Sequence, residues 1–512
     1  MTSSSAGEAP IAFSAAGAEG RLPLNQALPQ PPLLRPRLVA WGLGIGFALL
    51  VFHAAHSGFD HDEIVYLHAS WLVSQGQRPF VDFMEHHHPT LLYALAPLTR
   101  LLEGSPRGLV FAARLLNLGL LAALLLVFAR IVRPLLRDRD ARWPPLLLLG
   151  CFFFVRNSLE VRPDPWMAVL CLVGLWQWLV FLRSEGRLGH AALAGLCFGT
   201  AVAVLPKALY FLALVGLGTA LCLRRRAAWA HAARGAAVLV AVALLPLAAL
   251  ALALVRLGLW DAFVFWNYTF TPFYYWKTHF PGPSASETLL LSLEESPVLW
   301  LGGLLGVGFA ARAVWRRDAE PAVAIAAVVS VGFILAMFET KWPFSHNLLL
   351  MQPLLALLAA VVLDRVGAAR WRGALGLLLL AMLAKVGVLC LVYTENPGAE
   401  LVQKRLLEAS SPGTPLAVPP PYNPLFRPNA FYFWFNPQYF VAAYLEWCAL
   451  HGEPPLEVER DRRAWRERPP QFVYVPKDEP TWAPYDFASH QAQYGQTDIP
   501  GLWELLPRPR VP

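Results

Sequence analysis

Acidic side chains gather in a short segment that follows the first strongly apolar run of the sequence. Asp60, Asp62 and Glu63 lie in GFDHDEIVYL, and apolar residues at helical spacing continue from there to a glycine, Gly76. Asp60 with Glu63 three residues later forms a helix-capping box, which gives both acids a structural reason. Asp62 has none, and a carboxylate beside a hydroxyl can accept its proton. We predict a short amphipathic surface helix with Asp62 as the candidate general base; a plain surface acid is the alternative.

A second acidic segment, RNSLEVRPDP, begins at Arg156 and holds Glu160 and Asp164. Asp164 followed by Pro165 is a good helix N-cap with proline at the first helical position, so this aspartate has a structural explanation too. Two carboxylates near one site can hold a hydroxyl substrate or raise the pKa of a base. The segment is therefore a candidate partner of the first one.

Lysine is rare in this chain, so each lysine is worth locating. Lys207 falls in AVAVLPKALYF, at a turn between two apolar runs, and Lys341 shares ETKWPFSHN with His346. A lone lysine there can simply extend its ammonium group to a membrane interface. Polar groups at membrane depth are more often functional, so both lysines are candidate ligands for an anionic substrate.

Three consecutive histidines, His86, His87 and His88, invite a metal hypothesis. Consecutive side chains of an extended strand point alternately, so at most two of the three share one ion, and no distant cysteine or acid completes a convincing set. We expect no required metal, with a divalent ion as the lesser alternative. Hydrogen bonding of His88 to an acceptor or phosphate and plain interfacial packing are the other interpretations.

The composition of the chain indicates the class of protein that positions these residues. Of 512 residues 56% are hydrophobic and 15% charged, and the mean hydropathy is +0.45. Soluble domains carry about 25% charged residues, so an ordinary globular chain is excluded. The net charge of +7 is spread over short loops, which makes nucleic-acid binding improbable.

Apolar runs predict an all-α polytopic membrane protein with about eleven transmembrane helices, each of the order of 20 residues. They lie at residues 38–56, 109–130, 144–155, 165–182, 191–205, 208–223, 235–255, 297–314, 321–337, 348–363 and 373–393. Residues 1–34, rich in Ala, Gly, Ser and Pro, are expected to form a disordered cytosolic tail. Residues 35–393 then form the transmembrane domain.

Loop cations give the orientation. With the N-terminus inside, five short loops hold sixteen arginines, whereas the longer facing loops hold far fewer basic residues. An odd number of spans places the C-terminus outside. We therefore expect a protein of the bacterial inner membrane with its C-terminus in the periplasm.

Three outer segments are too long to be mere connections: 57–108, 256–296 and 394–512. Within the second, the aromatic stretch 263–280 predicts an interfacial helix. The third is expected to be a small periplasmic α/β domain, with helices near 400–410 and 437–452 and strands near 415–418 and 471–475. Five of the six cysteines lie in apolar runs, so no structural disulfide is expected.

The first outer segment resembles the GT-C superfamily, polytopic glycosyltransferases that use polyprenyl-phosphate sugars. The likeness is closest to bacterial relatives of the protein mannosyltransferases and of the lipid A aminoarabinose and galacturonic acid transferases. The matching residues are Asp62-Glu63, Gly76, Pro79-Phe80, Asp82-Phe83 and His88-Pro89, with Arg114 in the second span. Thr90 stands where the family often has a second proline, which departs from the protein-mannosylating branch.

The resemblance implies that Asp62 is the general base and that Asp164, beside Arg162, belongs to the second acidic site of the family. It implies a substrate-binding set made of Glu63, His88, Arg114, Arg162, Lys207, Lys341 and His346. The expected partners are a polyprenyl-phosphate-linked sugar, membrane lipid and an acceptor glycan, lipid or protein, with no nucleic acid and no required cofactor.

Two other classes compete with this enzyme. A secondary transporter or flippase places polar groups near the bilayer midplane, often in repeated halves, whereas here the acids lie at the outer ends of spans and no repeat is visible. A non-catalytic partner in envelope polysaccharide synthesis would keep the fold without needing Asp62.

Overall fold

The structure is a computed structural model that describes residues 36–136, 142–184, 187–223, 226–278, 282–366, 369–476 and 486–507. The predicted cytosolic tail, 1–34, lies outside the described residues. The described chain is mostly helical, with a few short strands near its C-terminal end.

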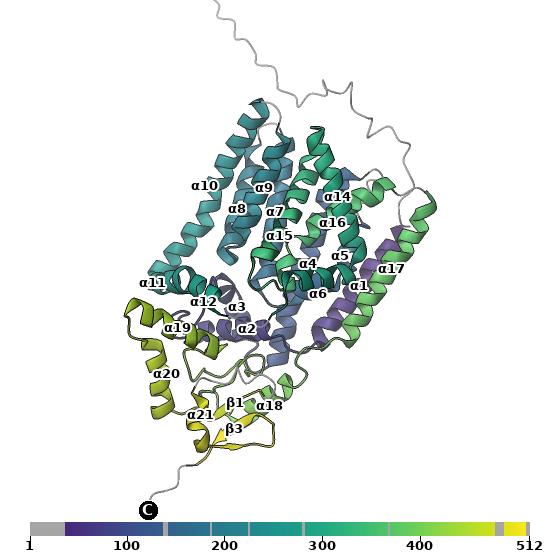
Figure 1. Cartoon of the computed structure of the whole chain (residues 1–512). Coiled ribbons are helices and arrows are strands. Elements are labelled where there is room, and N and C mark those ends of the chain that lie inside the picture. The colour runs from purple at the N-terminus through teal and green to yellow at the C-terminus, as the bar shows by residue number, and fades with distance from the viewer. Residues whose placement is uncertain are drawn as a thin grey trace, which may run out of the picture.

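Long apolar helices stand side by side and form the body of the molecule (Figure 1). They are α1 (Pro36–His56), α4 (Pro106–Val132), α7 (Pro163–Arg183), α8 (Leu188–Val204), α9 (Ala208–Cys222), α10 (Arg226–Arg256), α14 (Pro297–Trp315), α15 (Pro321–Glu339), α16 (Gln352–Val366) and α17 (Ala369–Val392). Six helical segments of the described chain are long and apolar enough to cross a membrane, and three shorter apolar segments accompany them. The prediction of a multi-pass helical membrane protein is confirmed.

The third predicted run, 144–155, is not one helix. It is divided into α5 (Pro145–Leu149) and α6 (Phe152–Leu159). The Glu295 carboxylate accepts a hydrogen bond from the Phe153 N–H at 2.9 Å, which caps the start of α6. Lys385, which lies in α17, donates to the Glu295 carbonyl at 3.1 Å. The bond from the Phe153 N–H to Glu295 therefore stabilises the start of α6 after the break.

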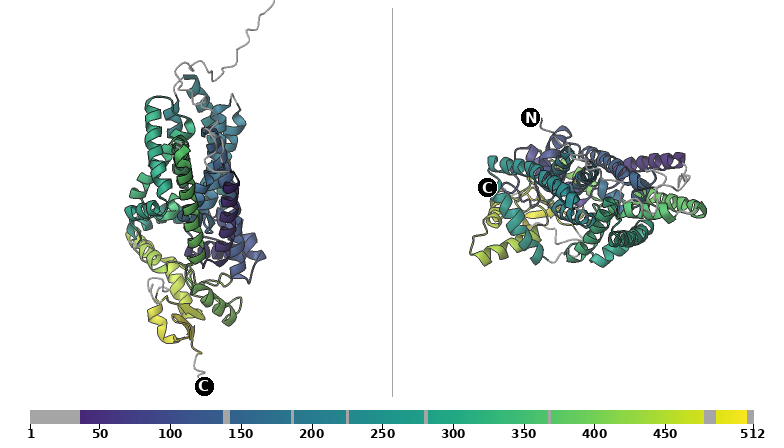
Figure 2. Two further views of the ribbon diagram at one scale, coloured as in Figure 1. Left: turned by 90° about the vertical axis from the view of Figure 1, so that its right-hand side faces the viewer. Right: turned by 90° about the horizontal axis from the view of Figure 1, so that it is seen from above.

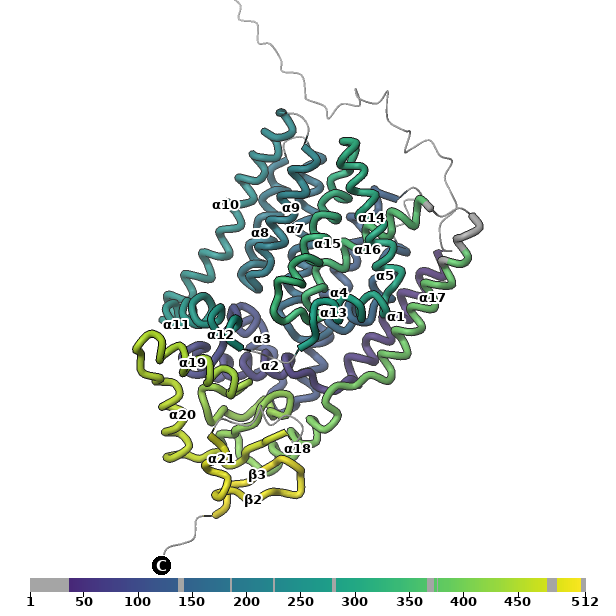
Figure 3. The backbone as a smooth tube through the Cα atoms, viewed as in Figure 1, coloured from purple at the N-terminus to yellow at the C-terminus, as the bar shows by residue number. Residues whose placement is uncertain are grey.

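Shorter helices cross one end of the bundle (Figure 3). They are α2 (His61–Ser74), α3 (Thr90–Leu101), α11 (Trp260–Val264), a π-helix (Phe265–Phe270), α12 (Thr271–Lys277) and α13 (Ala285–Glu295). Helix α2 is the helix predicted after Asp60, but it is not a surface helix, because Glu63–Leu72 are all buried in a core shared with the C-terminal region. Gly76, just beyond it, has a φ of 85°, a conformation that glycine adopts without strain. The aromatic stretch of the second outer segment is helical, as expected.

The C-terminal region lies beyond these crossing helices, at the end of the molecule (Figure 1). It contains α18 (Ala399–Ala409), α19 (Pro437–His451), α20 (Leu456–Glu467), α21 (Phe487–His490), β1 (Phe472–Tyr474), β2 (Tyr494–Gln496) and β3 (Leu502–Leu505). The strands form an antiparallel sheet in the order β1-β3-β2, with Val473 opposite Trp503. The expected α/β character is confirmed, but the predicted strand 415–418 makes only isolated bridges.

The C-terminal region is fixed to the first outer segment by hydrogen bonds. Met84 N–H donates to the Tyr432 carbonyl at 2.9 Å, and the Tyr432 hydroxyl donates to the Phe80 carbonyl at 2.7 Å. The buried Asp461 carboxylate in turn accepts from the N–H groups of Tyr432 and Phe433. These contacts join a shared hydrophobic core, so the segment that carries Asp62 is held between the bundle and the C-terminal region.

Helices α1 and α17 pair along one flank of the molecule (Figures 1 and 2). The first predicted span therefore lies against the last one, and the residues that follow α17 return to those that follow α1. A Cβ atom added to Gly58 would lie 1.6 Å from the Glu395 carbonyl oxygen, so only glycine fits where these segments cross. Gly58 N–H also donates to the Thr394 hydroxyl at 3.0 Å, and the Asn396 amide donates to the Phe59 carbonyl at 2.9 Å.

Candidate active site

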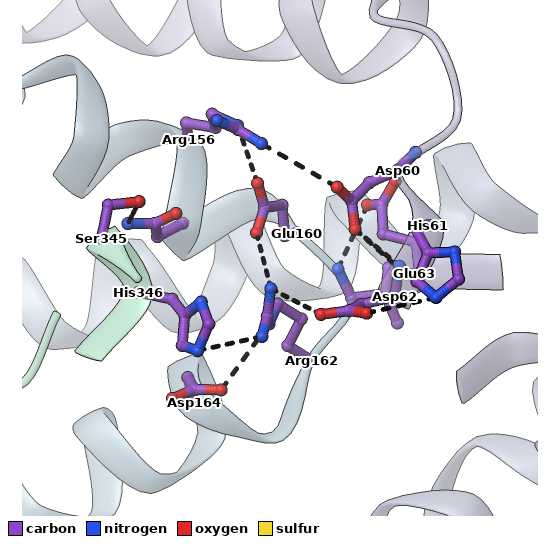
Figure 4. A network of polar contacts seen from close by, with 12 residues as sticks. Asp60, His61, Asp62, Glu63, Arg156, Glu160, Arg162, Asp164, Ser345 and His346 are labelled. Carbon is purple, nitrogen blue, oxygen red and sulfur yellow. Dashed lines mark hydrogen bonds and ion pairs between the residues drawn. The ribbon is translucent and has the colours of Figure 1, made fainter. Parts of the chain in front are cut away.

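The start of α2 presents three acids in three different ways. The Asp60 carboxylate accepts from the N–H groups of Asp62, at 2.8 Å, and Glu63, at 3.3 Å, while the Glu63 carboxylate accepts from the Asp60 N–H at 3.3 Å. The capping box predicted from the sequence is confirmed. The cap uses the side chains of Asp60 and Glu63 and leaves that of Asp62 free of it. The Asp62 side chain points into a cluster of charged residues at the junction of α6 and α7 (Figure 4).

Arg162 lies at the centre of this cluster (Figure 4). Its guanidinium lies 2.8 Å from Asp62 Oδ2, 3.6 Å from Glu160 Oε2 and 3.7 Å from Asp164 Oδ2. It also lies 3.2 Å from Nε2 of His346, a residue of the 3-10 helix Ser345–Leu348. One arginine thus joins the first acidic segment to the second and to the loop before α16.

The local fold explains the position of Arg162 and corrects one expectation. Helix α7 begins at Pro163, and Arg162 is its N-cap in an extended conformation. Asp164 is therefore a residue of the first turn and not the N-cap predicted from Asp164-Pro165. A carboxylate in the first turn is stabilised by the helix dipole, and its side chain faces the cluster instead of capping its own helix.

Lys207 completes the cluster from the turn before α9. Its ammonium group forms an ion pair with Asp164 and lies 3.4 Å from the side-chain oxygen of Asn347. The Asp164 side chain is 5% exposed and that of Lys207 is 29% exposed. The structure thus brings together five of the predicted residues: Asp62, Arg162, Asp164, Lys207 and His346.

Glu63 and Arg114, also predicted as substrate-binding residues, lie beneath this surface. Their side chains are 0% and 6% exposed and form a two-point ion pair, with 2.8 Å between Arg114 Nε and Glu63 Oε1. Arg114 also donates to the carbonyls of Ala54, Ser57 and Gly58. The pair ties the start of α2 to α4, so it positions Asp62 and offers no accessible group to a substrate.

Lys341 and His88 lie outside the cluster that Arg162 organises. The Lys341 ammonium donates to the Trp276 carbonyl at 2.7 Å. His88 bonds to the Ala203 carbonyl at 3.1 Å and to the Tyr268 hydroxyl at 2.8 Å. Lys341 thus links its loop to α12, and His88 links the first outer segment to α8 and to the π-helix Phe265–Phe270.

Sequence reasoning missed two members of the cluster, Arg156 and Glu395. Arg156 Nε lies 2.8 Å from Glu160 Oε1, and the same guanidinium pairs with Glu395 and lies 3.9 Å from Asp60. Asp60, Glu160, Arg156 and Glu395 all line one cavity beside the ends of α1 and α17. Glu395 follows the last predicted span, and no local pattern there points to a site far back in the chain.

The number of carboxylates exceeds the number of cations in the cluster, which favours the protonated form of some of these acids. The cluster and its support contain six carboxylates (Asp60, Asp62, Glu63, Glu160, Asp164 and Glu395) but four permanent cations (Arg114, Arg156, Arg162 and Lys207). Two retained protons would make the two sides equal. Burial and the neighbouring Asp60 charge raise the pKa of Glu160 to about 8.

The pKa of Glu395 is also raised, to about 9, by burial and by its hydrogen bond to Asp60. Burial would raise the pKa of Asp60 as well, but the bond from Glu395 and the charges of Arg162 and Arg156 bring it down to about 2. At neutral pH Glu160 and Glu395 therefore hold the two protons.

Two groups of residues in the described part of the chain have the composition of a metal site. The potential ligand atoms of Asp60, Glu160 and Glu395 lie within 4.8 Å of one another, and so do those of Glu85, His86 and His87. The first group is already held by arginines. The expectation that no metal is required stays a prediction.

Comparison with solved structures identifies proteins of similar fold. ArnT from Cupriavidus metallidurans bound to undecaprenyl phosphate matches with a TM-score of 0.52 and 17% identity, over 74% of this chain and 73% of that one. Its apo structure gives the same TM-score at 16% identity. The archaeal oligosaccharyltransferase AglB from Archaeoglobus fulgidus, in complex with an inhibitory peptide and a dolichol-phosphate, matches with a TM-score of 0.53 and 13% identity, over 92% of this chain and 74% of that one.

No protein-family model matches the sequence, and no similar sequence was found among curated proteins. The chain shares its fold with ArnT and with the archaeal oligosaccharyltransferase AglB, which agrees with the fold that its first outer segment predicted.

Proposed function

We propose that the chain is an integral-membrane glycosyltransferase that moves a hexosyl or pentosyl group from a polyprenyl-phosphate donor to a hydroxyl group. The acceptor is an envelope glycan, lipid or protein at the periplasmic face of the bacterial inner membrane. Residues 35–393 form the catalytic domain, 394–512 the periplasmic domain and 1–34 the cytosolic tail.

One observation carries this proposal: Asp62 is the most accessible carboxylate of the cluster. Its side chain is 36% exposed, whereas those of Asp60, Glu160 and Asp164 are 14%, 7% and 5% exposed. Arg162 holds it in place at 2.8 Å. An acceptor hydroxyl can therefore reach Asp62 and no other acid of the cluster as easily.

The chemistry then follows from the groups present. The acceptor oxygen attacks the anomeric carbon as its proton passes to Asp62, and the bond from that carbon to the phosphate oxygen breaks. The electron pair leaves with the polyprenyl phosphate. General-base help contributes typically 10²–10⁴-fold to such a step, and cations near the departing phosphate stabilise its charge.

We assign the phosphate to Lys207 and Arg162, because they are the cations paired with Asp164 and Asp62 in the cluster. Solved proteins of the same fold hold undecaprenyl phosphate or a dolichol-phosphate, which supports a polyprenyl-phosphate donor. The anionic donor would compete with Asp164 for the Lys207 ammonium group.

The test is a deletion strain complemented with wild-type protein or with Asp62→Asn. Lipid and glycan analysis should show one sugar missing in the deletion strain, restored by wild type and not by Asp62→Asn at equal membrane abundance. Asp498→Asn, which alters an exposed acid near Arg405, is the control and should restore the sugar. Full restoration by Asp62→Asn would contradict the proposed catalysis and favour the secondary transporter or flippase.

A further inference from the structure

The segment Glu85–His87 contains a buried charge that the proposed reaction does not use. It lies between α2 and α3, and the Glu85 side chain is 0% exposed. Within 4.0 Å its ion-pair partners in the described chain are the neighbouring histidines, His86 and His87, with no lysine or arginine. A buried carboxylate without a permanent cation is costly.

Two other buried acids of this protein do have such cations. Glu63 is paired with Arg114, and Asp164 is paired with Lys207. At Glu85 one oxygen, Oε1, accepts from the N–H groups of His86, at 2.8 Å, and His87, at 3.0 Å. The other oxygen, Oε2, is buried and has no hydrogen-bond partner.

The two histidines complete a set of ligands around this carboxylate. His87 Nδ1 lies 2.8 Å from Glu85 Oε1, and His86 Nδ1 lies 3.8 Å from it. The His86 Nδ1 atom is buried and also has no hydrogen-bond partner. Each of the three residues offers one ligand atom, and these three atoms all lie within 4.8 Å of one another.

The geometry removes the sequence-based objection to a shared ion. A fully extended chain would send the rings of His86 and His87 to opposite sides, but here their centroids lie 3.8 Å apart. The chain turns because the Glu85 carboxylate binds both following N–H groups. Carboxylate and histidine ligands can therefore converge from three consecutive residues.

We propose that Glu85, His86 and His87 bind one divalent transition-metal ion, with Zn²⁺ as the probe that fits them. Two imidazole nitrogens and one carboxylate oxygen are ligands that Zn²⁺ accepts, at about 2.0–2.2 Å and with tetrahedral geometry. The ion neutralises Glu85. His87 is 31% exposed, so its side is open for a fourth ligand from solvent.

The surroundings indicate what the ion does. The His86 ring packs on Phe435 and Phe440 from the C-terminal region, and the His87 ring lies 5.4 Å from that of Tyr66 in α2. The ion therefore fixes the segment where the bundle, α2 and the C-terminal region meet. This role is structural and independent of the proposed sugar transfer.

The experiment uses the full chain purified in detergent without a polyhistidine tag, stripped with a chelator, reloaded with Zn²⁺ and desalted. We expect about one Zn²⁺ per chain by mass spectrometry of the metal, and a higher melting temperature for the loaded protein. Glu85→Gln and His86→Asn should each weaken Zn²⁺ binding by more than about 100-fold, because even outer-shell losses cost about 10–100-fold.

Two control variants separate this site from others. His190→Asn changes a histidine that bonds to Gln177 and should keep the ion. Glu395→Gln changes the other candidate metal-binding group, made of Asp60, Glu160 and Glu395, and should keep the ion as well. Loss of Zn²⁺ in Glu395→Gln, retention in both Glu85→Gln and His86→Asn, or no stoichiometric Zn²⁺ in the wild type would each overturn the proposal.

A measurement on the wild type keeps the proposal testable if a variant fails to fold. Zn²⁺ should protect His87, whose side chain is 31% exposed, from modification by diethyl pyrocarbonate, read by peptide mass spectrometry. Equal modification with and without Zn²⁺ would overturn the proposal. Apo Glu85→Gln should melt at or above the temperature of apo wild type, since it removes an unneutralised buried charge.

Discussion

Replacing Lys207 by alanine removes the ammonium group that pairs with the buried Asp164 carboxylate. Loss of one partner of a buried ion pair costs about 3–5 kcal/mol of the free energy of unfolding. Asp164 keeps Arg162 at 3.7 Å, so we expect a loss near the lower end, about 3 kcal/mol. Asp164→Asn should cost less, because Lys207 is 29% exposed and can reach water.

The double variant Lys207→Ala, Asp164→Asn separates stability from function. It removes the charge that Lys207→Ala leaves unpaired, so its free energy of unfolding should return to within about 1 kcal/mol of wild type. Its use of donor should not return. A charge-assisted contact to phosphate is worth about 1.5–3 kcal/mol, and the donor KM should therefore stay roughly tenfold to 150-fold above that of Asp164→Asn.

The assays are unfolding in detergent and steady-state kinetics with a purified polyprenyl-phosphate sugar. Lys404→Ala is the matched control, because that ammonium group is on α18 and its side chain is 73% exposed. A double variant whose donor KM equals that of Asp164→Asn would refute the reasoning. Lys207 would then be a partner that neutralises Asp164 and no ligand of the donor.

Three further outcomes are expected. Asp62→Asn should lower turnover by at least about 10²-fold, whereas Asp60→Asn keeps a capping side chain and should be milder; a dead Asp60 variant beside an active Asp62 variant would reverse the assignment. The raised pKa values of Glu160, about 8, and Glu395, about 9, mean that both acids ionise as the pH rises through this range. Added negative charge should then raise the donor KM above about pH 8, and Glu395→Gln should reduce that rise; a donor KM independent of pH would contradict it. Since these protons bind more tightly in the folded state, stability should also fall from about pH 4.5 toward pH 9 in thermal melts. A reporter active only in the periplasm, fused after Pro512, should be active, and a silent but abundant fusion would overturn the proposed topology.

Local patterns in the sequence predicted local structure well. The apolar runs other than 144–155 coincide with helices of the bundle, and the spacing of Asp60 and Glu63 predicted their capping box. These features depend on residues within a few positions of one another. The start of α7 was misplaced by two residues because Pro163 and Pro165 are both suited to a first helical turn.

Contacts between distant segments were beyond such patterns. Glu395 lies more than 300 residues from Asp60, and Arg156 meets it only because the end of α17 returns to the end of α1. Likewise, the sequence identifies Glu63 and Arg114 as charged residues but not as partners of each other. Both residues were expected to bind substrate, but they are paired with each other, buried, and support the start of α2 that carries Asp62.

The crossing of residues 394–396 over residues 58–59 has a consequence for how the protein matures. Translation produces the acidic segments early. It produces residues 394–396 late, after the last apolar helix has left the ribosome. Non-local contacts of this kind form only when both segments are present. A nascent chain that lacks α17 therefore has its acids without the residues that fix them. A protein truncated before Glu395 is expected to lack the proposed activity.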